Sequence, residues 1–77
     1  MKTFKFNIIQ NRESINICAK FDGEVIVSVF WDPHTDCCCF KACGDSFQTN
    51  VVTYDDYKEF VYLLDEAYDT VLASHRL

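Results

Sequence analysis

The residue types in this chain that are best suited to bind a metal or attack a substrate lie close together. His34, Cys37, Cys38, Cys39 and Cys43 supply one imidazole and four thiols, and both groups are zinc ligands. Zinc sites usually use C-x2-4-C pairs at turns, and this run lacks that spacing. If the run is a strand, alternate cysteines point to opposite faces, so three consecutive thiols cannot converge. We therefore expect structural thiols that pack as small hydrophobic side chains, with no metal and no cofactor.

The chain offers little that could act in catalysis. It has no C-x-x-C motif, and neither His34, in a loop after Pro33, nor His75, near the C-terminus, has an identifiable role as a general base. The two glycines of the chain argue against a phosphate-binding loop. We therefore expect no enzymatic activity.

The composition predicts one globular domain that spans residues 1–77, because 49% of the residues are hydrophobic. A net charge of −5 argues against direct binding of nucleic acid or of anionic membranes, since phosphates are bound by Lys and Arg. No apolar run approaches the roughly 20 residues that cross a bilayer. Five cysteines without an export signal favour a reduced compartment, so we expect a cytoplasmic protein.

Apolar and polar residues alternate through the first two thirds of the chain, which is typical of strands. From Thr53 the apolar period becomes helical, and Thr53 with Asp56 predicts a capping pair. The sequence therefore predicts an α+β fold, with a four- to five-stranded antiparallel meander sheet and one C-terminal helix packed on one face. The expected strands are about residues 2–9, 14–21, 24–31, 37–42 and 47–52, and the expected helix is about residues 54–74.

Two turns set the expected register of the first three strands. A two-residue turn at Asp22-Gly23 and a four-residue turn at residues 10–13 both predict the same inward face. That face consists of Phe4, Phe6, Ile8, Ile15, Ile17, Ala19, Ile26 and Phe30. The helix is expected to cover it with one stripe of Tyr57, Phe60, Val61, Leu64, Tyr68, Val71 and Leu72.

The same register predicts a second apolar surface on the opposite face of the sheet. It consists of Val25, Val27, Val29 and Trp31, with Cys37 and Cys39 beside them. Because the only expected helix is already used, this surface is a candidate interface for a partner or a second subunit. The alternative is that loop 32–36 and the C-terminus fold over it.

Nearly all the net charge lies in the predicted helix. Residues 53–77 hold six acids against Lys58 and Arg76, which accounts for −4 of the total −5. A helix with charge of one sign is a candidate surface for a basic partner, and the alternative is a face that is merely solvated. The candidate partner-binding residues, on the outer face and its shoulder, are Asp55, Glu59, Tyr62, Asp65, Glu66 and Asp69.

In size, charge and architecture, the whole chain resembles small phage-encoded inhibitors of the anti-CRISPR and anti-restriction type, without a shared sequence motif. The resemblance implies a small acidic inhibitor that occludes a basic, nucleic-acid-binding surface of a CRISPR-type nuclease complex in the host cytoplasm. It also implies that the acidic helix faces Lys and Arg residues of that complex. Two alternatives stay open: a homodimeric structural or regulatory module that uses the outer sheet face, and a thiol metal-binding protein.

Overall fold

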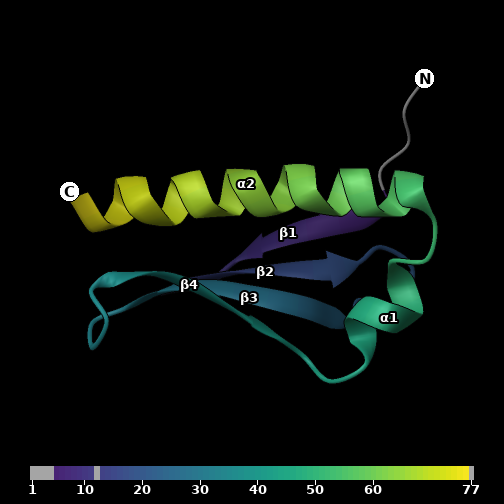
Figure 1. The fold of residues 1–77 in the computed structure, drawn as a ribbon, viewed down its shortest axis with the longest axis horizontal. Coiled ribbons are helices and arrows are strands. Elements are labelled where there is room, and N and C mark those ends of the chain that lie inside the picture. Colours follow the sequence, from purple (N-terminus) through teal and green to yellow (C-terminus); the bar gives the residue numbers. More distant parts are fainter. Residues whose placement is uncertain (1–4, 12, 77) are drawn as a thin grey trace.

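The computed structural model describes residues 5–11 and 13–76. They form, in chain order, β1 (Phe6–Gln10), β2 (Ser14–Ala19), β3 (Val25–Asp32), β4 (Cys37–Ala42), α1 (Ser46–Asn50) and α2 (Tyr54–Arg76). The strands make one antiparallel sheet in sequential order, and α2 lies across one of its faces (Figure 1). The predicted α+β fold is confirmed. Residues 2–4 of the first predicted strand lie outside the described residues.

In the first hairpin, the pairing of β1 with β2 is shifted by two residues from the predicted register. Phe6 lies opposite Ala19 and Ile8 lies opposite Ile17. The turn is tighter than predicted, since the backbone N–H of Asn11 donates to the carbonyl oxygen of Ser14 at 2.8 Å. A shift of two residues leaves each side chain on its original face, so the inward face of β1 and β2 is the predicted one.

The second hairpin differs from the prediction in a way that matters more. Its loop has four residues, because the N–H of Ala19 donates to the carbonyl of Glu24 at 2.8 Å. Gly23 closes this loop with a φ of 70°, a conformation that glycine adopts without steric cost. A β-bulge then follows: Ile17 lies opposite Val27, whereas Cys18 lies opposite Val25.

The bulge reverses the predicted faces of β3. One extra residue in β3 shifts the pairing by one position, and a shift of one position moves every later side chain to the other face. Val27, Val29 and Trp31 therefore face α2, while Ser28 and Phe30 face away from it. The prediction that Phe30 faces the helix is wrong, because turn chemistry alone does not reveal a bulge.

The predicted fifth strand, residues 47–52, is also wrong, because this segment forms the short helix α1 at one end of the sheet (Figure 1). The N–H of Thr49 donates to the carbonyl of Asp45 at 3.0 Å, and the side-chain amide of Asn50 donates to the carbonyl of Ser46. Phe47 packs edge to face against Phe60 of α2, with ring centroids 5.2 Å apart. Helix α1 therefore contributes to the core rather than to the sheet.

The core lies between α2 and the sheet. Its centre is β3 and β2, where Ile17 and Ile26 have no exposed surface. The buried apolar residues of this core are Phe6, Ile15, Ile17, Ala19, Ile26, Val27, Val29, Phe60, Leu63, Ala67 and Val71. The sheet face that points away from α2 carries no helix of the described residues.

Candidate protein-binding surface

The N-terminus of α2 is fixed by a reciprocal cap. The N–H of Asp56 donates to Oγ1 of Thr53 at 3.0 Å, and Oδ2 of Asp56 accepts from the N–H of Thr53 at 3.1 Å. The same carboxylate oxygen accepts from the N–H of Val52 and from Nζ of Lys5, each at 3.2 Å. The predicted capping pair is confirmed.

These contacts also set the charge state of Asp56. The N–H of Thr53, then Lys5 and the N–H of Val52, lower the pKa of the Asp56 carboxyl against the opposing effect of burial. The carboxylate is buried and charged, and it ties the start of α2 to β1. Asp56 is therefore part of the fold and does not present its charge to a partner.

Glu59 does not lie on the outer face of α2, where the sequence prediction placed it. Its residue is 8% exposed, and its Oε2 accepts a hydrogen bond from the backbone N–H of Lys5 at 3.0 Å. The prediction that its side chain points away from the core is wrong. The predicted stripe lies too far toward the tyrosines, and the side of the helix that meets the sheet is centred on Phe60, Leu63 and Ala67.

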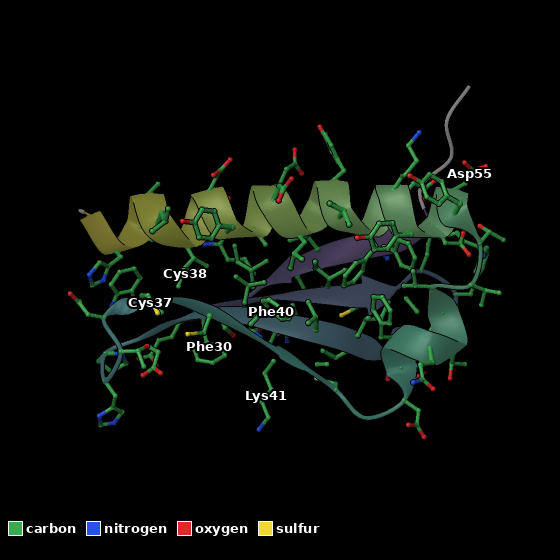
Figure 2. All side chains as sticks on the ribbon, in the orientation of Figure 1. Phe30, Cys37, Cys38, Phe40, Lys41 and Asp55 are labelled. Carbon is green, nitrogen blue, oxygen red and sulfur yellow. The ribbon has the colours of Figure 1, made fainter. Side chains whose placement is uncertain are left out.

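The other predicted acids are exposed. Asp55 lies in the first turn of α2 (Figure 2), and Asp65, Glu66 and Asp69 lie farther along the helix. Among the described side chains of α2, the exposed charged groups are these four carboxylates and one ammonium group, that of Lys58. Asp55 stabilises the helix dipole, but the other three lie too far along the helix for that effect.

All four tyrosines of the chain lie on α2, and each has a large exposed fraction. Tyr62, at 53% exposed, lies among the acids as predicted, and Tyr54, at 75%, lies near the start of the helix. Tyr57 and Tyr68 were predicted to be core residues, but each is nearly half exposed. The predicted stripe is therefore rotated around the helix relative to the side that the sheet covers.

Tyr68 lies beside β4, the edge strand of the sheet. An open apolar groove runs between α2 and β4, and its lining includes Val29, Cys38, Phe40, Leu64 and Tyr68. Cys38 and Phe40 point toward α2 from β4 (Figure 2), and Phe40 is 64% exposed. The exposed surface of α2 is therefore acidic on top and aromatic along the β4 side. The available signal in the sequence is that Tyr57 and Tyr68 lie eleven residues apart, about three helical turns, and so on one side of the helix.

The second candidate interface is not an exposed surface. Val27 and Val29 are 3% and 2% exposed and pack under α2, and Trp31 is half-buried against the same core. Val25, before the bulge, is half-buried on the opposite face. The predicted patch on the outer sheet face is wrong, since the bulge turns its main residues inward.

The cysteines differ from the predicted set of small buried side chains. Cys18 is buried, and burial with the nearby Cys43 raises the pKa of its thiol. Cys38 is half-buried and packs against the core, opposite Trp31. Cys37 is exposed and Cys39 half-exposed, and their sulfur atoms lie 3.7 Å apart on the face away from α2. Packing therefore explains Cys18 and Cys38 but not this pair.

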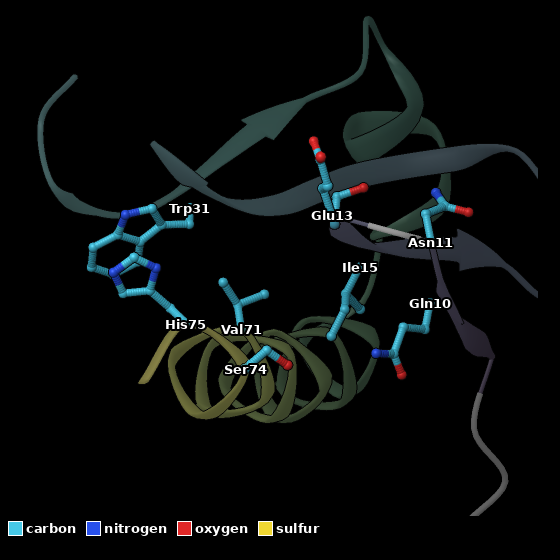
Figure 3. A pocket seen from close by; sticks show the side chains of 9 residues that line it. Gln10, Asn11, Glu13, Ile15, Trp31, Val71, Ser74 and His75 are labelled. Carbon is cyan, nitrogen blue, oxygen red and sulfur yellow. The ribbon is translucent and has the colours of Figure 1, made fainter. Parts of the chain in front are cut away.

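A polar hollow lies between the far end of α2 and the first hairpin (Figure 3). Its volume is about 250 Å³, and Gln10, Glu13, Trp31 and His75 are among its lining residues. The ring of His75 stacks on Trp31, with centroids 3.7 Å apart. This stack holds the end of α2 against β3. The volume of the hollow is below the roughly 300–1,000 Å³ that is typical of small-molecule sites.

Within residues 5–11 and 13–76, no group of three or more His, Cys, Asp or Glu side chains lies close enough together to hold one metal ion. Neither helix in that part of the chain is long and apolar enough to cross a membrane. Comparisons with protein-family models, with curated proteins and with solved structures found no match.

Proposed function

We propose that the chain is a small protein-binding inhibitor whose contact surface is the exposed face of α2. The observation that carries this proposal is the joint exposure of Asp55, Asp65, Glu66 and Asp69 with the tyrosines of the same helix. Carboxylates of one sign attract a basic surface over a distance of about one Debye length, roughly 10 Å at 0.1 M salt. Tyrosine supplies contact area at low conformational cost and is enriched in interfaces.

The rigidity of the helix favours binding over mere solvation. The cap at Thr53 and Asp56, the apolar core and the stack of His75 on Trp31 hold α2 at its start, middle and end. A partner therefore meets carboxylates on a fixed backbone, and little ordering entropy is lost on binding.

The partner that fits this surface is a protein with a Lys- and Arg-rich face, and nucleic-acid-binding complexes carry such faces. By occupying that face, the chain would keep nucleic acid from it. A CRISPR-type nuclease complex in the host cytoplasm is the partner class that the resemblance implies. The inhibitory step is occlusion, with α2 as the occluding element.

Charge density favours contact with the basic face over imitation of DNA. Asp55 and Asp69 are separated by about 21 Å along the helix, given a rise of about 1.5 Å per residue. Four exposed carboxylates in that length amount to roughly one per 5 Å, whereas duplex DNA carries about one charge per 1.7 Å. The tyrosines must therefore supply much of the affinity, and the acids orient and accelerate the encounter.

The test is retention of a partner from the native host on the immobilised chain, compared with a charge-reversed variant. Glu66→Lys with Asp69→Lys moves the formal net charge from −5 to −1, since each reversal changes it by two. Glu13→Lys with Asp45→Lys is the matched control, because both acids are exposed and neither is a residue of α2. We expect the control to retain the same partner and the helix variant to lose it.

Competition with nucleic acid tests occlusion separately. Added DNA or RNA should displace the partner from the wild-type chain, and the chain should reduce nucleic-acid binding by that partner. If both double variants retain the partner equally, α2 is not the contact surface. If nucleic acid and the chain bind the partner together, inhibition by occlusion is excluded even though binding stands.

A further inference from the structure

Cys37 and Cys39 form an isolated pair of thiols on the sheet face that points away from α2. They lie two positions apart on β4, so their side chains share a face. Their sulfur atoms are 3.7 Å apart, and the hydroxyl oxygen of Thr35 lies 3.1 Å from the Cys37 sulfur and 3.8 Å from the Cys39 sulfur. Packing gives no reason for this arrangement, because Cys37 is exposed.

The strand disfavours a disulfide between the two sulfurs. Residues two apart on an extended strand have Cα atoms roughly 6.6 Å apart, at the upper end of the range that a disulfide tolerates, and their Cβ atoms point in parallel. A disulfide needs Cβ atoms about 3.8 Å apart. Forming the bond would therefore require β4 to bend away from β3, to which Cys37 and Cys39 are paired through Asp32 and Phe30.

The same sulfur separation fits two ligands of one metal ion. Thiolate sulfurs lie about 2.3 Å from zinc, and two of them at a tetrahedral angle are about 3.8 Å apart. The observed 3.7 Å therefore needs almost no movement of β4.

The surroundings of the pair favour a cation. Asp32 lies opposite Cys37 on β3, and its carboxylate is close enough to act electrostatically on Cys39. A positive ion at the two sulfurs would meet a negative neighbour and relieve the repulsion between the thiolates.

We propose that Cys37 and Cys39 chelate a thiophilic metal ion of the zinc class. Binding forms two metal–sulfur bonds, releases one proton from each thiol and changes no oxidation state. The remaining coordination positions face solvent. They are open to water or to the same two sulfurs of a second copy, because β4 is the edge strand and its outer face carries no helix of the described residues.

Cobalt(II) and zinc(II) are the probes that test this site, added to the reduced chain without oxygen. Cobalt bound by thiolates gives a sulfur-to-metal absorption band, and zinc should displace it. We expect the band in the wild-type chain, with either one metal per chain or one per two chains, and both ratios support the site. Proton release should accompany binding.

Variants locate the metal. Cys37→Ser with Cys39→Ser should weaken zinc binding at least about 100-fold, since it removes both ligands where even outer-shell changes cost 10–100-fold. Cys38→Ala is the matched control, because Cys38 points to the opposite face (Figure 2), and it should bind as the wild type does. Far-UV circular dichroism checks that each variant is folded.

Three results would overturn the proposal. They are no cobalt band in the wild-type chain, unchanged zinc affinity in the folded double variant, or an equal loss of binding in Cys38→Ala. The probe is a metal and not the partner of α2, so the outcome is independent of the proposed inhibitory function.

Discussion

Two glutamates of α2 should respond in opposite ways to the same substitution. Glu59 is 8% exposed and accepts a hydrogen bond from the backbone N–H of Lys5, which is 54 positions away in the sequence. Glu66 is exposed, and its backbone carbonyl accepts a hydrogen bond from the hydroxyl of Thr70. Truncation of Glu59 therefore breaks a link between α2 and the residue before β1, whereas truncation of Glu66 leaves its backbone hydrogen bond in place.

The size of the difference follows from the lost hydrogen bond. A hydrogen bond to a charged group contributes about 1.5–3 kcal/mol, and Glu59→Ala also leaves the Lys5 N–H without its acceptor. We expect Glu59→Ala to lower the free energy of unfolding by about 2 kcal/mol. In a domain of this length that corresponds to a fall in Tm of roughly 8–16 °C. Glu66→Ala should stay within about 0.5 kcal/mol of the wild type.

Thermal and urea unfolding followed by circular dichroism measure both variants. Glu59→Gln is the second control, since its amide oxygen can still accept from Lys5 and should recover part of the loss. Equal stability of Glu59→Ala and Glu66→Ala would refute the orientation of α2. It would return Glu59 to the outer face, where the sequence pattern placed it.

Three further predictions concern the fold. The pKa of Asp56 is lower in the folded chain than its unfolded value near 3.8, so the carboxylate contributes stability that is fully present above pH 3.8 and is lost as pH falls through the folded pKa. Below about pH 4, Tm should therefore fall more steeply with pH in the wild type than in Asp56→Asn. Val29→Ala should cost about 2 kcal/mol and Val25→Ala less than about 1 kcal/mol, and the reverse order in urea unfolding would contradict the bulge. Phe47→Ala should cost about 3 kcal/mol by removing a ring from the core, and a change below about 1 kcal/mol would show that α1 does not pack there.

Local patterns in the sequence were enough to predict the strands and the long helix. Alternation located β1 and β2, the β-branched and aromatic run located β3, and the loop and turn on either side of residues 37–42 located β4. The change of period at Thr53 located the start of α2. The cap at Thr53 and Asp56 was predicted because it depends on residues three apart and on little else. The predicted inward face of β1 and β2 is correct although the predicted register is wrong by two residues, because side chains alternate between faces with a period of two.

The face of β3 could not be predicted in this way. It depends on one extra residue in the strand, and both faces of β3 contain apolar residues. The more apolar set, Val27, Val29 and Trp31, faces the helix, and that comparison was the available signal. Residues 47–52 likewise include four β-branched or aromatic residues, yet residues 47–50 lie in helix α1, where Phe47 packs on Phe60.

The site was predicted in part. Tyr62 and the acids at 55, 65, 66 and 69 are exposed, as the helical wheel indicated, whereas Glu59 is not. A wheel gives the spacing of side chains but not which side of the helix the sheet will cover. The distance between the sulfurs of Cys37 and Cys39 depends on side-chain rotamers, so the sequence could place them on one face but could not indicate that they meet.

The proposed role of α2 is tested most directly by the association rate of the retained partner as a function of ionic strength. The wild-type chain and the Glu13→Lys with Asp45→Lys control should associate fast at low salt, and their rates should fall together as salt rises. Glu66→Lys with Asp69→Lys should associate at least about tenfold more slowly at low salt, with a weaker salt dependence. If the helix variant matches the control in rate and in salt dependence, although both carry the same net charge, the acids of α2 do not face the partner.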